Sequence, residues 1–85
     1  KDGLEYLSGA FGKMGLEYVP SVTNFILVKT GKGRSVFEAL QRKKVVVRPM
    51  DPSGLPDHIR VTVGTMKENR IFIRALKEVM NEGVA

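Results

Sequence analysis

The sequence predicts a small α+β domain, a two-layer sandwich in which helices cover one face of a mixed or mainly antiparallel sheet of three to four strands. Apolar residues recur at helical spacing near both ends of the chain, short β-branched runs lie between them, and segments rich in Gly, Pro, Asp and Ser separate these patterns. With 85 residues and a hydrophobic content of 42%, the chain has room for one core. We therefore expect a single domain over residues 1–85.

The first element is expected to be a helix that ends near Gly15, because glycine is typical of helix C-termini. Its apolar residues recur at spacings of three and four: Leu4, Leu7, Phe11 and Met14. Residues 24–29 then form a nearly continuous apolar run, Asn-Phe-Ile-Leu-Val-Lys. Such a run is typical of a strand buried on both faces, so we expect it to be the central strand of the sheet.

A second helix is expected after the glycine-rich turn at residues 30–34. Residues 35–38, Ser-Val-Phe-Glu, match a capping box and predict a helix that opens there and continues to about Lys43. Residues 45–48, Val-Val-Val-Arg, predict the next strand. Pro49 has no amide hydrogen to donate, so it ends this strand or places it at an edge of the sheet.

The last strand and the last helix have the clearest patterns. In residues 59–63, Ile-Arg-Val-Thr-Val, apolar residues alternate with others, so Arg60 is expected on the face opposite the core. Residues 65–68, Thr-Met-Lys-Glu, match a second capping box. An amphipathic helix is predicted to follow, with its apolar residues at helical spacing: Phe72, Ala75, Leu76, Val79 and Met80.

Composition excludes several classes of chemistry. The chain has no cysteine, which rules out disulfides and thiolate metal sites, and its single histidine, His58, argues against a zinc site or a Ser-His triad. We expect His58 to be an exposed polar residue. The net charge of +5 is compatible with nucleic acid or small anions as ligands. Nothing in the sequence indicates a membrane span or a signal peptide, so a cytoplasmic location is expected.

Arg48 and Arg60 are the candidate binding residues. Each belongs to one of two short strands that bracket the loop at residues 51–57, and strands hold their side chains in fixed directions. A guanidinium offers a fork of donors that matches carboxylate or phosphate oxygens. If the two strands pair, the two forks form an anion site, and the alternative is that both arginines are solvated surface charges.

Two other features are assigned no site. Residues 31–35, Gly-Lys-Gly-Arg-Ser, precede a helix but match neither the P-loop nor the dinucleotide-binding pattern. Lys13 lies near the end of an amphipathic helix, where it lacks the desolvated pocket that a Schiff-base lysine requires. Two alternatives of another class remain open at this point, a small RNA-binding module and a free-standing module that binds an amino acid.

Three segments together resemble the C-terminal small domain of the histidinol-phosphate aminotransferases, which belong to the pyridoxal-phosphate-dependent class I/II aminotransferases. The segments are residues 20–28, 45–50 and 54–65, followed by Glu68-Asn69, and the resemblance covers essentially the whole chain. Threonine-phosphate decarboxylase shares this layout. The Arg-Val-Thr-Val-Gly-Thr sequence at residues 60–65 is more similar to the histidinol-phosphate enzymes.

The resemblance implies transfer of an amino group between histidinol phosphate and 2-oxoglutarate, in histidine biosynthesis, by a cytoplasmic homodimer. It implies that Arg48 and Arg60 bind the substrate anion. The cofactor would be pyridoxal phosphate, bound by a large domain together with the catalytic lysine, so that no catalytic or cofactor-binding residue lies on this chain. The chain alone would then be inactive. Asp51-Pro52-Ser53 departs from the family pattern, which leaves the role of the 51–57 loop undecided.

Overall fold

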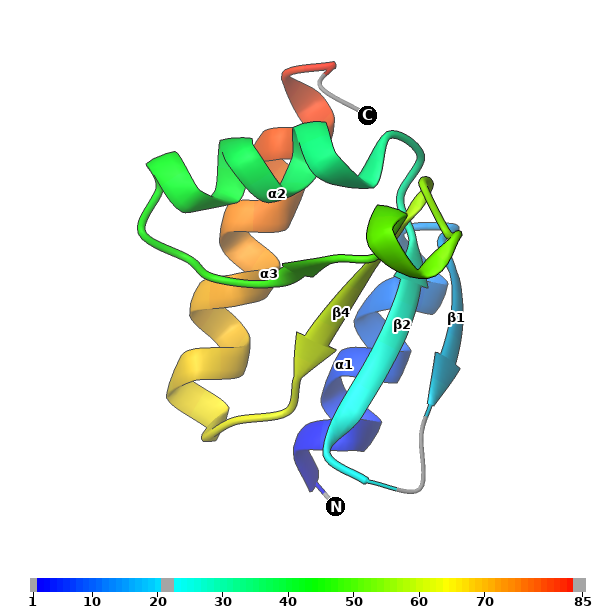
Figure 1. The fold of residues 1–85 in the computed structure, drawn as a ribbon. Coiled ribbons are helices and arrows are strands. Elements are labelled where there is room, and N and C mark those ends of the chain that lie inside the picture. The colour runs from blue at the N-terminus through cyan, green and yellow to red at the C-terminus, as the bar shows by residue number, and fades with distance from the viewer. Residues whose placement is uncertain (1, 21–22, 84–85) are drawn as a thin grey trace.

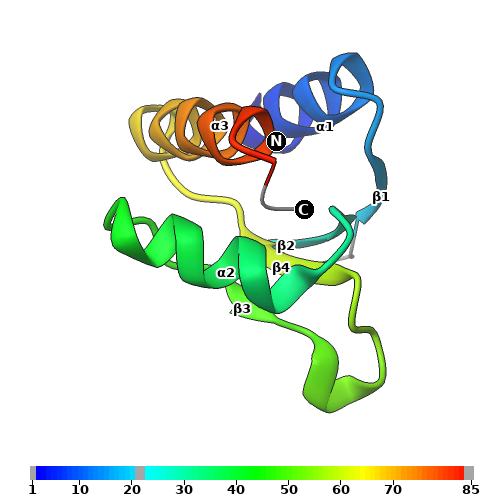
Figure 2. The same cartoon turned by 90° about the horizontal axis from the view of Figure 1, so that it is seen from above.

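The computed structural model describes residues 2–20 and 23–83. Within them the chain forms a four-stranded antiparallel sheet of order β1-β2-β4-β3. The elements follow in chain order: α1 (Asp2–Lys13), β1 (Glu17–Pro20), β2 (Phe25–Lys29), α2 (Gly33–Arg42), β3 (Arg48–Pro49), the 3₁₀ helix η1 (Asp51–Ser53), β4 (His58–Thr62) and α3 (Met66–Asn81). Helices α1 and α3 lie side by side behind the sheet, and α2 packs against α3 and β4 (Figures 1 and 2). The predicted two-layer α+β fold is confirmed.

The core lies between the helices and one face of the sheet. Ile26 and Val28 of β2 and Ile59 of β4 are fully buried there, as are Phe11 of α1 and Leu76 of α3. The residues that alternate with them on β2 are only half-buried, because their face of the sheet carries no helix. The expectation that β2 is buried on both faces is therefore wrong.

The sequence signals at both ends of the chain are confirmed. Helix α1 ends before Gly15, which adopts a φ of 72°, a conformation that glycine enters without steric penalty. At the start of α3, Glu68 donates its backbone N–H to the Thr65 hydroxyl, while the Thr65 N–H donates to the Glu68 carboxylate. No helix in the described residues combines the length and the apolar content needed to cross a bilayer.

Helix α2 begins at Gly33, three residues before the start that a capping box at residues 35–38 indicates. Ser35 and Glu38 lie inside the helix, so the predicted capping box is wrong. Lys32 precedes the helix in a left-handed conformation and makes no side-chain cap. The Gly33 N–H instead donates to the carbonyl of Pro56 at 2.8 Å, so a distant loop caps this helix.

Two strands differ from the sequence expectation. The strand predicted at residues 45–48 is reduced to Arg48–Pro49, because residues 45–47 leave the helix without pairing to β4. Pro49 lies on an edge strand, as its missing N–H requires. Strand β1 was not predicted. It has only four residues and ends in Pro20, so its sequence shows little periodicity. The strand is stabilised by its pairing with β2.

Candidate functional site

Arg48 and Arg60 face each other across the β3–β4 ladder. They are register partners, and Pro49 pairs with Ile59 beside them. Directly opposed residues of antiparallel strands project to the same face of the sheet. Because Ile59 and Val61 point into the core, Arg60 and its partner lie on the open face. The structure thus brings the two predicted residues together.

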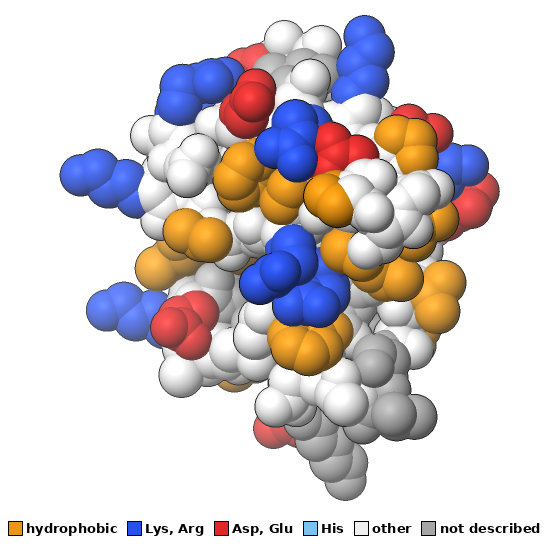
Figure 3. All heavy atoms as spheres, viewed as in Figure 1, with side chains coloured by type: hydrophobic (Ala, Val, Ile, Leu, Met, Phe, Trp, Pro, Cys, Tyr) orange, Lys and Arg blue, Asp and Glu red, His pale blue; other side chains and the backbone are white. Residues whose placement is uncertain are grey.

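The surroundings of the pair are mainly apolar. Leu27 of β2 is the register partner of Arg60 on the side opposite Arg48, and Phe25 pairs with Thr62 one step along the same face. The Arg60 guanidinium carbon lies 4.2 Å from the centre of the Phe25 ring. In the space-filling view of this side, Lys and Arg side chains gather near the centre with hydrophobic side chains directly beside them (Figure 3). The candidate site therefore consists of two arginines next to apolar side chains on the open face of the sheet.

No carboxylate pairs with Arg48 or Arg60 within residues 2–20 and 23–83. By contrast, Arg34 donates through Nε and Nη2 to the two oxygens of Asp51, at 2.7 and 2.9 Å. Like charges directly opposite each other on a sheet are unfavourable. An anion bound between the two guanidinium groups would relieve this repulsion and accept several hydrogen bonds at once.

The loop after β3 is fixed next to Arg48. The two-oxygen contact with Arg34 raises the pKa of that guanidinium and lowers the pKa of the Asp51 carboxyl, chiefly through the side-chain hydrogen bond. Pro52 and Ser53 then line a surface hollow of about 330 Å³ together with Arg48. The first three residues of the predicted 51–57 loop, which form η1, therefore lie beside the candidate site.

The structure gives no reason to assign a site to Lys13 or to residues 31–35. Lys13 is exposed at the end of α1. Near residues 31–35, backbone carbonyls of Pro56 and Asp57 already accept the N–H groups of Thr30, Gly31 and Gly33, which leaves these amides unavailable for a phosphate. His58 is not the exposed residue that was expected: it is half-buried, and its Nδ1 is enclosed without a hydrogen-bond partner in the described residues.

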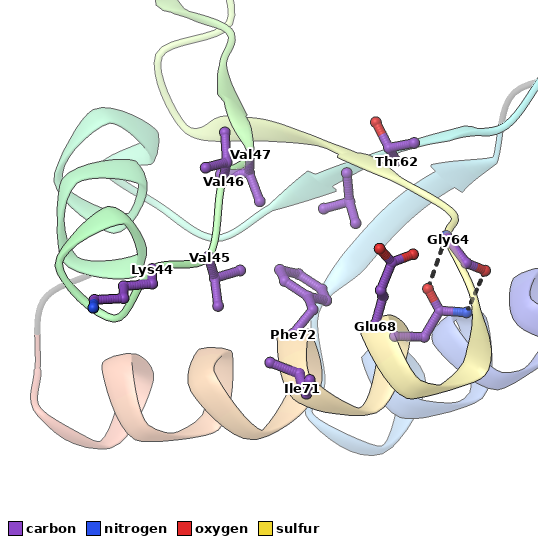
Figure 4. Close-up of a pocket in the computed structure, with 11 residues that line it drawn as sticks. Lys44, Val45, Val46, Val47, Thr62, Gly64, Glu68, Ile71 and Phe72 are labelled. Atoms are coloured by element: carbon purple, nitrogen blue, oxygen red, sulfur yellow. Dashed lines mark hydrogen bonds between the residues drawn. The ribbon is translucent and has the colours of Figure 1, made fainter.

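A second hollow, of about 390 Å³, lies between α3 and residues 44–47 (Figure 4). Its walls are largely apolar, with Val45, Ile71 and Phe72 pointing toward it. Two of its polar residues are already engaged, since Glu68 caps α3 and Asn69 makes two hydrogen bonds with the backbone of Gly64, and the Lys44 side chain extends away from the other lining residues (Figure 4). We assign it no role in binding an anion.

Phe25 is the residue of the site that the sequence analysis missed. Its place in an apolar run marked it as a core residue. The signal that identifies it is the register of β2 on β4, which sets Phe25 diagonally across from Arg60, and that register becomes known only once the strands are paired.

The sequence of residues 1–76 matches the profile of the family "Aminotransferase class I and II". This match covers most of the chain. The chain belongs to the class I and II aminotransferase family. The members of this family depend on pyridoxal phosphate.

Individual proteins with similar sequences include histidinol-phosphate aminotransferases. The chain is 51% identical over 84 residues to a histidinol-phosphate aminotransferase from Symbiobacterium thermophilum, covering 98% of this chain and 23% of that protein. It is 48% identical over 80 residues to the enzyme of the same name from Akkermansia muciniphila, covering 94% of this chain and 22% of the relative. The chain therefore spans less than a quarter of the length of these curated relatives and is homologous to one part of them.

A solved structure shows the same fold. The crystal structure of the histidinol-phosphate aminotransferase from Clostridium acetobutylicum superposes with a TM-score of 0.82 at 21% sequence identity, over 95% of this chain and 26% of that one. Together with the sequence match, this likeness identifies the fold as that of the aminotransferase small domain.

The lysines of the described residues do not have the surroundings that a Schiff-base lysine requires. A Schiff-base lysine needs a desolvated environment, and the lysines in this part of the chain are exposed, apart from Lys43. Lys43 is half-buried and pairs with Glu78 and Glu82 at 3.4 and 3.2 Å, and its hydrogen bond to Glu82 is the main cause of its raised pKa. A raised pKa is the opposite of what a nucleophilic lysine requires.

Proposed function

We propose that this chain is the C-terminal, substrate-binding small domain of a histidinol-phosphate aminotransferase, and that Arg48 and Arg60 bind the anionic group of its substrates. The observation that carries the proposal is the direct cross-strand pairing of two arginines on the open face, with no carboxylate partner in the described residues. The family match favours this function over the RNA-binding and amino-acid-binding alternatives.

Two guanidinium groups suit a transaminase that accepts different anions in turn. Amino transfer between histidinol phosphate and 2-oxoglutarate requires one site to take a phosphate in one half-reaction and carboxylates in the other. A guanidinium presents parallel N–H donors that match either group. The open sheet face leaves both arginines available to a substrate held against it.

The rest of the catalytic apparatus would come from outside this chain. Pyridoxal phosphate, which supplies the electron sink for amino transfer, would be bound by a large domain that also carries the catalytic lysine. We further propose that the intact enzyme is a cytoplasmic homodimer. Under this proposal the chain supplies recognition of the substrate anion and is inactive alone.

The test is substitution of each arginine in the intact aminotransferase that carries this chain. Each charge-assisted hydrogen bond contributes about 1.5–3 kcal/mol, so Arg60→Ala and Arg48→Ala are each expected to lower kcat/KM for histidinol phosphate by about 10²-fold or more. Retention of the cofactor absorbance would show that the cofactor site is intact. Arg74→Ala, on the exposed side of α3, is the matched control and should leave kcat/KM unchanged.

Two outcomes would overturn the proposal. Near-normal kcat/KM in both arginine variants would remove Arg48 and Arg60 from the binding site. Release of carbon dioxide from threonine phosphate, with no amino transfer from histidinol phosphate, would instead assign the chain to a decarboxylase of similar layout.

A further inference from the structure

Phe25 is the neighbour that fixes the Arg60 side chain. The guanidinium carbon of Arg60 lies 4.2 Å from the Phe25 ring centre, well inside the distance at which a cation is attracted to an aromatic face. The register explains the contact, because Leu27 pairs with Arg60 and Phe25 is therefore its diagonal neighbour on the same face. Diagonal neighbours on a sheet are within reach of aromatic and long side chains.

The nature of this partner matters for binding. A carboxylate partner occupies guanidinium donors, as Asp51 does when it accepts from Nε and Nη2 of Arg34. An aromatic ring attracts the cation through its face and accepts no conventional hydrogen bond from it. Arg60 is thus held in place by the ring, and no hydrogen bond or ion pair within residues 2–20 and 23–83 occupies its five N–H donors.

The contact also suits the electrostatics of the pair. Arg48 is directly opposite Arg60, and the repulsion between them favours conformers that separate the two guanidinium groups. The Phe25 ring lies on β2, on the side of β4 away from Arg48, and offers a compensating attraction there. It restricts the conformers of a long side chain before any ligand arrives, which lowers the entropy lost on binding.

We propose that Phe25 is a positioning residue for substrate recognition: its ring orders the Arg60 guanidinium with all of its donors free for the phosphate or carboxylate of the substrate. This inference rests on the proposed function, because it assumes that Arg60 binds the substrate anion. It adds a residue that acts through Arg60 and does not itself bind the anion.

The experiment is a double-mutant cycle in the intact aminotransferase. Phe25→Leu keeps an apolar side chain and removes the aromatic face, and it is expected to lower kcat/KM for histidinol phosphate by about 2- to 30-fold. The loss should appear as a higher KM and a higher inhibition constant for inorganic phosphate, with the cofactor absorbance unchanged. In an Arg60→Ala background, the same change should have no further effect on kcat/KM.

Two variants provide controls. Phe25→Trp retains an aromatic face and should preserve at least half of the normal kcat/KM, which a requirement for packing volume alone would not predict. Phe37→Leu removes a second arginine–aromatic contact of the described residues, in which the Arg34 guanidinium carbon lies 5.9 Å from the ring centre but Arg34 is already paired with Asp51. This variant should leave kcat/KM within about twofold of normal.

The outcomes separate the two proposals. If Arg60→Ala leaves kcat/KM unchanged, the proposed function fails and the role of Phe25 fails with it. If Arg60→Ala is strongly impaired but Phe25→Leu lowers kcat/KM equally in both backgrounds, the positioning role is wrong and the substrate role of Arg60 stands. Should Phe25→Leu lose the cofactor or unfold, Phe25→Trp decides instead, and a large loss of kcat/KM in that folded variant would overturn the inference.

Discussion

The cationic side chains at the two ends of α2 and those on the open face of the sheet have different partners. Around α2, Arg34 pairs with Asp51 and Lys43 pairs with Glu78 and Glu82, so each cation joins two segments that are distant in sequence. On the open face, Arg48 and Arg60 face each other with no such partner in the described part of the chain. The first arrangement fastens the fold, whereas the second keeps hydrogen-bond donors free at the expense of like-charge repulsion.

The largest expected effect tests whether the open-face arginines need their fork geometry. Arg60→Lys keeps the charge but replaces the planar fork with a point charge, so kcat/KM of the intact aminotransferase for histidinol phosphate should fall by about 10- to 100-fold. Thermal stability should change little, since Arg60 forms no ion pair in the described residues. Arg74→Lys on α3 is the control, and equal activity in the two variants would contradict the binding role.

The next effect concerns the close packing that fastens α2 to β4. A Cβ added at Gly33 would clash with the carbonyl oxygen of His58, a backbone atom that cannot move aside easily. Gly33→Ala should therefore lower the free energy of unfolding by about 1–3 kcal/mol, as overpacking does. Urea denaturation of the variant and of the unsubstituted protein measures this difference in the free energy of unfolding.

Gly9→Ala is the matched control for that substitution. A Cβ at Gly9 meets no atom within 4 Å, and alanine is the better helix former, so this change should raise stability by about 0.5–1 kcal/mol. A loss at Gly9 as large as that at Gly33 would show that the effect is not one of packing.

A smaller effect separates stability from function on the open face. Arg48→Glu replaces a like-charged cross-strand pair with an opposite-charged one, which should raise the free energy of unfolding by about 0.2–1 kcal/mol. The same change should also lower activity toward anionic substrates, because the introduced carboxylate would occupy hydrogen-bond donors of the Arg60 guanidinium. Decreased stability of Arg48→Glu in low salt would indicate that the two side chains do not interact.

The smallest effect is expected at the exposed Arg34–Asp51 pair. The hydrogen bond from Arg34 lowers the pKa of Asp51, so its stabilisation is present above the ordinary aspartate pKa and is lost as the pH falls through the lowered value. Asp51→Asn should lower the melting temperature at neutral pH. The difference from the unsubstituted protein should close at low pH and shrink in high salt. A difference that persists in strong acid would point to a cause other than this carboxylate.

The helices at the two ends of the chain were predictable because their signals are local. Gly15 ends α1, and Thr65 with Glu68 opens α3, through contacts within a few residues. The start of α2 was not predictable in this way. Its first N–H bonds to the carbonyl of Pro56, more than twenty residues away, and the Ser-x-x-Glu pattern lies inside the helix and does not cap it.

The residues of the candidate site also differ in whether a local sequence pattern could predict their positions. Alternation within residues 59–63 is a local pattern, and it placed Arg60 opposite the core correctly. Arg48 as its direct partner, Phe25 as its diagonal neighbour and the unpredicted strand β1 all depend on which strands pair and in what register. Side-chain periodicity fixes the face on which a residue lies, but the ladder between strands fixes its neighbours, and that ladder forms only when the chain has folded.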